Sequence, residues 1–318
     1  MGNIEQYSAY HNKMRSLVNS VYDMQKLRIA TGNRLVASLY GESADAAGEE
    51  VDGSRLRPIL TDYQRITDYY AQQASKRPRI TTVLNEVRSE LQVIKTQLDF
   101  DMASTYFDLC RAEERQLKAV KREVQEAPIW ENFLKDVKGC GPLMGAICIA
   151  YLDVYKARHC SSFWKYAGLD TVETEDGRRI GRNRSCTEMR EYTARDGSVQ
   201  FKKSLTYNPF LKTKLCGVLG GAFLKAKDSQ YGKVYYDYKN RLQNRADDSL
   251  TPGHIHAMAT RYAVKMFLRD LWVAWRQLEG LPVSEPYEVV FLERRPHGDP
   301  NLQPMEIKDS VSQMETED

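Results

Sequence analysis

Apolar side chains recur three or four residues apart along most of residues 1–127, and this spacing restricts that part of the chain to amphipathic helices. In the first segment the apolar stripe consists of Tyr7, Tyr10, Met14, Leu17, Val21 and Met24. A second helix is predicted over residues 60–75. A third stripe starts at Ile80 and reaches Leu98, and we expect its helix to continue to Glu126. Residues 1–127 are therefore predicted to form a helical, coiled-coil-like module.

Stripes of this kind need an apolar partner surface, and two partners fit the sequence. The helices can pair with each other within one chain, or the same stripes can join two copies in a homodimer. Gly32 and the small, acidic stretch 41–53 interrupt the pattern. A mobile loop is expected in that stretch.

The composition is that of an ordinary globular protein, with 42% hydrophobic and 28% charged residues. No apolar run approaches the roughly 20 residues that span a bilayer, and the first residues lack a basic and then apolar signal sequence. We therefore expect a cytoplasmic protein without a membrane partner. The six cysteines form no C-x-x-C pair, so free thiols are expected and no zinc site is predicted.

The charge is distributed unevenly, although its total is only +3. Of the 46 basic and 43 acidic residues, residues 156–245 contain 19 and 9, and the rest of the chain contains 27 and 34. A solvated basic surface is the simplest interpretation of such a surplus. Its concentration in one segment is also typical of a protein that binds a polyanion.

Residues 137–146 have the pattern of a helix-hairpin-helix. Gly139 and Gly141 are separated by one residue, and Pro142 and an apolar helix follow at once. Glycines let the backbone turn tightly and approach a partner closely, and the amides that begin the next helix can hold a phosphate oxygen. A plain glycine turn between two packed helices is the alternative. The hairpin residues expected to contact nucleic acid are Lys138, Gly139, Cys140 and Gly141.

Residues 170–203 are polar, and their glycines flank short β-prone pieces, so we expect a small β excursion there. Basic residues gather in and around it. The predicted track for backbone phosphates consists of Lys165, Arg178, Arg179, Arg182, Arg184, Lys202, Lys203, Lys212 and Lys214. The predicted fold class is mainly α, with a helical N-terminal half, a helix-hairpin-helix domain over residues 128–290 and a disordered acidic tail over residues 291–318.

Several aromatic and histidine residues of the C-terminal half are candidates for function or for the core. The tyrosines that can stack on unpaired bases are Tyr207, Tyr231, Tyr235 and Tyr238. The last three share one helical face, so core packing is the preferred interpretation. His254 and His256 do not share a helical face, and no metal site is predicted for them. Trp272 and Trp275 are predicted to anchor the core of the last helix.

The hairpin is followed by a short helix that ends in the sequence Y-A-G-L at residues 166–169, where Gly168 is suited to a left-handed cap. The order of G-x-G-P, Y-A-G-L, a Gly- and Arg-rich excursion and later helices with Lys212, Lys214 and residues 261–265 resembles the C-terminal domain of bridge-RNA-guided, serine-type insertion-sequence transposases. The resemblance covers residues 134–279. It implies a helix-hairpin-helix domain that binds the DNA target.

In that family, a serine in the loop after Y-A-G-L attacks the DNA backbone. The corresponding loop here, residues 170–177, contains no serine, and Thr174 and Ser185 are the candidate substitutes. The family also has an N-terminal RuvC-like domain that holds magnesium with four acidic residues, and no such domain is recognisable in this sequence. Asp99 and Asp101 form a D-x-D pattern, but on a helix they point in different directions.

The function predicted from the sequence is binding of DNA, with structured RNA as an alternative ligand, in a transposase-like setting. One alternative is an active transposase or recombinase with Ser185 or Thr174 as nucleophile. A second alternative is a module that binds other proteins. No cofactor is predicted, and Mg²⁺ is expected only if the chain is catalytically active.

Overall fold

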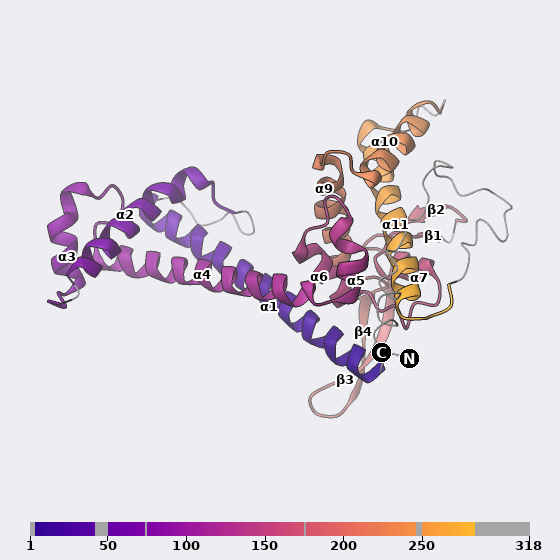
Figure 1. Cartoon of the computed structure of the whole chain (residues 1–318), viewed down its shortest axis with the longest axis horizontal. Coiled ribbons are helices and arrows are strands. Elements are labelled where there is room, and N and C mark those ends of the chain that lie inside the picture. The colour runs from indigo at the N-terminus through magenta and orange to yellow at the C-terminus, as the bar shows by residue number, and fades with distance from the viewer. Residues whose placement is uncertain (1–3, 42–49, 74, 175, 246–249, 284–318) are drawn as a thin grey trace, which may run out of the picture. The chain divides into compact units, whose positions relative to one another are not determined.

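A computed structural model describes residues 4–41, 50–73, 75–174, 176–245 and 250–283 (Figure 1). This part of the chain is mainly helical and carries two small antiparallel sheets, which confirms the predicted fold class. The predicted tail 291–318 and most of the predicted loop 41–53 lie outside the described residues. Where the chain is described, no helix has both the length and the apolar character needed to cross a membrane.

The chain forms two compact units, and one of them is inserted into the other. The inserted unit consists of residues 16–120, and the second unit combines residues 1–15 with the chain from residue 121 onward. The sequence pattern predicts residues 1–15 as part of the N-terminal module. They pack instead on the C-terminal part, because the Tyr7 ring lies 4.6 Å from the ring of Tyr155 and 6.2 Å from that of Trp275. The helical spacing of apolar residues does not reveal which unit those residues pack against.

Helices α1 (Ile4–Tyr40) and α4 (Gln97–Gln125) run antiparallel in the inserted unit. Arg28 of α1 pairs with Glu113 of α4. Further along α1, an ideal Cβ on Gly32 would lie 2.7 Å from the ring of Tyr106, which precedes Glu113 in α4. These contacts join α1 and α4 within one chain, and the homodimer stays a prediction.

The single helix predicted from Ile80 to Glu126 is wrong. The other elements of the inserted unit are α2 (Gly53–Gln72), α3 (Ile80–Val87) and the 3-10 turn η1 (Arg88–Glu90). After η1 the chain leaves the helix and resumes it only at Gln97. The carboxylate of Asp62 on α2 is fully buried and accepts hydrogen bonds from the backbone amides of Gln92, Val93 and Ile94, which holds this stretch in a non-helical form. The break contains no glycine or proline, so the sequence does not signal it.

Helix α11 (Pro252–Leu278) forms the centre of the second unit. Its buried face includes Phe267 and Leu271, and the predicted core positions of Trp272 and Trp275 are confirmed by exposed fractions of 1% and 2%. The elements around it are α5 (Pro128–Asn132), η2 (Leu134–Asp136), α6 (Pro142–Tyr151), α7 (Cys160–Tyr166), α8 (Pro209–Thr213), the π-helix η3 (Lys214–Leu219), α9 (Gly220–Lys225) and α10 (Gln230–Gln243).

The predicted β excursion consists of two separate two-stranded sheets between α7 and α8. Strands β1 (Thr171–Glu173) and β2 (Arg179–Gly181) form the short first hairpin. Strands β3 (Thr187–Thr193) and β4 (Val199–Leu205) form a longer ribbon that leaves the helices and ends in a turn (Figure 1). Both hairpins are antiparallel, with Thr187 opposite Leu205 at the base of the second.

Candidate nucleic-acid interface

The predicted hairpin lies between η2 and α6. Its first element is short, because α5 ends at Asn132 and only one 3-10 turn precedes the glycines. The Cys140 amide donates a hydrogen bond to the Val137 carbonyl over 2.9 Å, which closes the turn. At Gly141 the backbone is extended, with φ −77° and ψ 170°, and helix α6 begins at the next residue.

Gly139 and Cys140 stabilise this turn. Gly139 has a left-handed φ of +98°, and a Cβ at this position would lie 3.0 Å from the backbone carbon of Ala222 in α9. A glycine is therefore required for the fold itself. The Cys140 side chain is buried, and burial raises the pKa of its thiol to about 12. The Cys140 side chain therefore belongs to the core, and contact of this residue with nucleic acid stays a prediction.

Lys138 and Gly141 form the accessible tip of the hairpin. Both are exposed, and nothing lies within 4 Å of an ideal Cβ on Gly141. The next residue is a proline without an N–H, and the amides of Leu143 and Met144 follow in the first turn of α6, where no preceding helical carbonyl is available to them. The Lys138 carbonyl accepts a hydrogen bond from the Ser229 hydroxyl at 3.4 Å, which anchors the tip to the start of α10.

The predicted phosphate track separates into an exposed part and a structural part. Six of its basic residues are exposed to solvent, namely Lys165, Arg178, Arg179, Arg184, Lys202 and Lys203. Arg182 is 8% exposed, and its Nε and Nη2 atoms pair with the two carboxylate oxygens of Asp170 at 2.7 and 2.8 Å. Its Nη1 atom donates to the Thr206 hydroxyl. Arg182 therefore joins the two hairpins internally, and its contact with a phosphate stays a prediction.

Lys212 and Lys214 are half-buried rather than exposed. The Lys212 ammonium donates to the Arg182 carbonyl and lies 5.0 Å from the centre of the Tyr207 ring. The Lys214 ammonium lies 5.6 Å from the centre of the Phe210 ring. Burial lowers the pKa of both ammonium groups below the usual lysine range. Sequence spacing cannot separate such residues from the solvated lysines near them.

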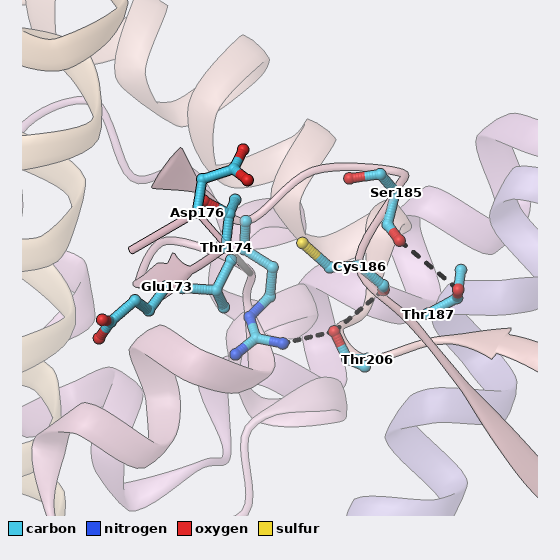
Figure 2. Close-up of a pocket in the computed structure, with 9 residues that line it drawn as sticks. Glu173, Thr174, Asp176, Ser185, Cys186, Thr187 and Thr206 are labelled. Atoms are coloured by element: carbon cyan, nitrogen blue, oxygen red, sulfur yellow. Dashed lines mark hydrogen bonds between the residues drawn. The ribbon is translucent and has the colours of Figure 1, made fainter. Parts of the chain in front are cut away.

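Both candidate nucleophiles line one open pocket of about 590 Å³, beside β1 and β2. Figure 2 shows Glu173, Thr174 and Asp176 on one side and residues 185–187 on the other, with the Cys186 sulfur directed into the space between them. Val172, Arg182 and Thr206 complete the lining. The structure thus brings together two hydroxyls that are distant from each other in the sequence.

The environment of these hydroxyls is that of structural turns. The Ser185 Oγ donates to the Asn183 side-chain oxygen at 2.6 Å, and the Thr174 Oγ1 donates to the Arg178 carbonyl at 3.0 Å. A nucleophilic serine or threonine needs a base that accepts its proton. In the described part of the chain, neither hydroxyl makes a hydrogen bond to a histidine, lysine or carboxylate. The described residues also contain no group of three or more His, Cys, Asp or Glu side chains placed to hold a metal ion.

Most of the tyrosines considered for base stacking belong to the core. Tyr207, Tyr231 and Tyr235 are buried, and Tyr238 stacks on Tyr262 with 4.2 Å between the ring centres. The Tyr235 hydroxyl lies 2.7 Å from the Nδ1 atom of His256. These contacts confirm core packing as the preferred interpretation of the tyrosine face on α10.

Sequence reasoning missed the part that Arg261 plays in the basic region. An ideal Cβ on Gly181 would lie 2.2 Å from the Nη1 atom of Arg261, so the guanidinium of this α11 residue rests against the end of β2. The two residues are far apart in the sequence. Only the glycine at residue 181 is a local signal, and by itself it fits any strand end.

Comparison with protein-family models, with curated proteins and with solved structures found no match for this chain.

Proposed function

We propose that this protein binds nucleic acid, and DNA in the first place, by holding backbone phosphates at the helix-hairpin-helix tip. The observation that carries the proposal is the exposed junction of Lys138 and Gly141 with the start of α6. The Lys138 ammonium and the amides that begin α6 can bind a phosphate oxygen. These groups do not distinguish one base from another. Binding is therefore directed by backbone shape and charge.

The charge of the surrounding segment supports the same ligand. Six exposed basic residues of the predicted track lie on α7, on the two hairpins and in the loop between them. Counterions released from the phosphates make such binding strongly dependent on salt. The resemblance to serine-type transposases stays a prediction, and so does the use of structured RNA.

Gly141→Leu is the sharpest test of the hairpin. The backbone at Gly141 is in an ordinary extended conformation with open space around it, so leucine fits the fold but obstructs a phosphate. Gly253→Leu is the matched control, because Gly253 also lies at a helix start with nothing within 4 Å of an ideal Cβ. We expect fluorescence anisotropy with labelled duplex DNA to show at least a roughly tenfold loss for Gly141→Leu, equivalent to about 1.4 kcal/mol.

Two results would contradict the proposal. One is an absence of salt-sensitive binding to duplex DNA, single-stranded DNA and structured RNA by the unmodified protein. The other is equal binding by Gly141→Leu and Gly253→Leu. A protein–DNA adduct that survives denaturation and disappears in Ser185→Ala or Thr174→Val would instead support the transposase alternative.

We also propose that the protein is cytoplasmic. The six cysteines are free thiols in the structure, which is the ordinary state in a reducing compartment. Fractionation of the source cells with antibodies against the protein tests this placement.

A further inference from the structure

Two cationic side chains from different helices converge on consecutive residues at the end of β2. The guanidinium of Arg261 on α11 rests against Gly181, as the 2.2 Å distance from an ideal Cβ shows. The ammonium of Lys212 on α8 donates to the carbonyl of Arg182. Consecutive Cα atoms are about 3.8 Å apart, so the two cationic groups approach the same short piece of backbone.

The carboxylate near these groups is already engaged. Asp170 uses both oxygens to pair with Arg182 at 2.7 and 2.8 Å. Among the described residues, no carboxylate forms an ion pair with Lys212 or Arg261. The group of Arg182, Lys212, Arg261 and Asp170 therefore has an excess of positive charge in a place where its members are half-buried or buried.

We propose that Lys212 and Arg261 together bind an oxyanion, and that in the working protein this oxyanion is a phosphate of the nucleic-acid backbone. The inference rests on the proposed nucleic-acid binding and assigns it a second phosphate contact, separate from the hairpin tip. An arginine fork and a lysine ammonium are complementary ligands for phosphate, since one binds two oxygens and the other acts as a compact charge.

The electrostatics of Lys212 favour the binding of an anion beside it. Burial lowers the pKa of its ammonium and the neighbouring Arg261 charge lowers it further, while Cys216, Cys186 and Asp170 oppose this shift. Partial burial of two like charges is unfavourable, because each loses hydration and repels the other. A bound phosphate reverses both effects, since it supplies opposite charge at short range. Lys212 then becomes easier to protonate.

The position of the pair also favours a backbone phosphate over an internal counterion. Gly181 and Arg182 follow Arg179 on β2 and precede Arg184, and both of these arginines are exposed. A nucleic-acid strand that contacts Arg179 and Arg184 therefore passes the same end of the hairpin formed by β1 and β2. Gly181 itself has no side chain, and a Cβ there would displace the guanidinium of Arg261.

The test is a ligand titration of the full chain, with ¹³C-labelled lysine side chains observed by NMR. The Lys212 signal is identified as the one lost in Lys212→Arg. Inorganic phosphate and a short oligothymidylate are added separately. We expect both to shift the Lys212 signal in a saturable way and to raise the pKa of its ammonium, with the oligonucleotide acting at lower concentration.

Variants separate this site from the rest of the basic surface. Arg261→Gln is expected to abolish both responses and to reduce the salt slope of DNA binding by about 0.9, the value for one phosphate contact. Arg261→Lys keeps the charge and is expected to retain a weaker response. Arg195→Gln is the matched control, because Arg195 is an exposed arginine in the turn between β3 and β4 and lies outside the predicted phosphate track. Its Lys212 response is expected to equal that of the unmodified chain.

Each result bears on a different claim. If neither ligand shifts the Lys212 signal, or if Arg261→Gln responds like the unmodified chain, the anion site is refuted even where DNA binding through the hairpin persists. A response to phosphate without one to the oligonucleotide refutes the assignment to a nucleic-acid backbone. Loss of binding in Gly141→Leu with an intact Lys212 response to phosphate supports two separate contacts.

Discussion

The Asp62 carboxylate is fully buried and holds the chain between η1 and α4 by accepting three backbone amides. Asp62→Ala leaves those amides without a partner inside the inserted unit. Of the three residues that donate these amides only Ile94 is buried, and a buried, unsatisfied amide costs about 1–3 kcal/mol, so we expect a loss of about that size in the free energy of unfolding. Urea denaturation measures it. Asp68→Ala is the control, because Asp68 is exposed on the same helix, and its effect is expected to stay within about 0.5 kcal/mol.

His11 makes the second unit sensitive to acid. It is 8% exposed, and its Nε2 atom has no hydrogen-bond partner in the described structure. Burial lowers its pKa below the usual 6.5, and the charges of Arg15 and Lys156 lower it further, while Asp153 opposes them. The unfolded chain therefore binds the proton more readily than the folded one.

The contribution of neutral His11 to the free energy of unfolding is complete above pH 6.5. It is lost as the pH falls from 6.5 towards the pKa of folded His11. The slope reaches at most about 1.4 kcal/mol per pH unit. Denaturant unfolding at a series of pH values measures it. His11→Gln is expected to flatten the profile, and His254→Gln, at an exposed histidine, is expected to leave it unchanged. Identical profiles for both variants would contradict the assignment to His11.

The pairing of α1 and α4 depends on a poorly hydrated ion pair. The side chains of Arg28 and Glu113 are only 13% and 10% exposed. Removal of Arg28 leaves the buried Glu113 carboxylate with a hydrogen bond from the Gln25 amide but without its ion-pair partner, so Arg28→Met alone is expected to cost about 3–5 kcal/mol. The double change Arg28→Met with Glu113→Leu is expected to recover most of that loss. A double-mutant cycle in urea measures the coupling, and simple additivity of the two changes would contradict this account.

The elements differ in how far the sequence could predict them. The stripe that includes Val21, the β excursion and the start of α6 follow from local periodicity and turn residues. The break before Gln97 does not, because it depends on a carboxylate that lies distant in the sequence, on α2. The same limit applies to the site: exposed Arg178 and buried Arg182 are equivalent in sequence, and only the packing of Asp170 against Arg182 separates them.

At the scale of the whole molecule, the N-terminal end of α1 is part of the unit that contains the candidate interface. All four tryptophans of the chain follow residue 120, so their fluorescence reports on this unit alone. Tyr7→Ala removes ring contacts to Tyr155 and Trp275, and we expect it to destabilise the unit by about 2 kcal/mol. The control Tyr70→Ala changes an exposed tyrosine of the inserted unit and is expected to leave the fluorescence transition unchanged.

The insertion of one unit into the other also orders events during synthesis. The ribosome releases residues 1–15 first and the whole inserted unit next, before the segment that carries Tyr155 and Trp275 exists. Residues 16–120 have all their own contacts at that stage, whereas Tyr7 has no surface to pack on. The inserted unit can therefore close while translation continues, and the unit with the hairpin closes last. In the nascent protein, α1 and α4 therefore pair before the basic surface of the second unit has formed.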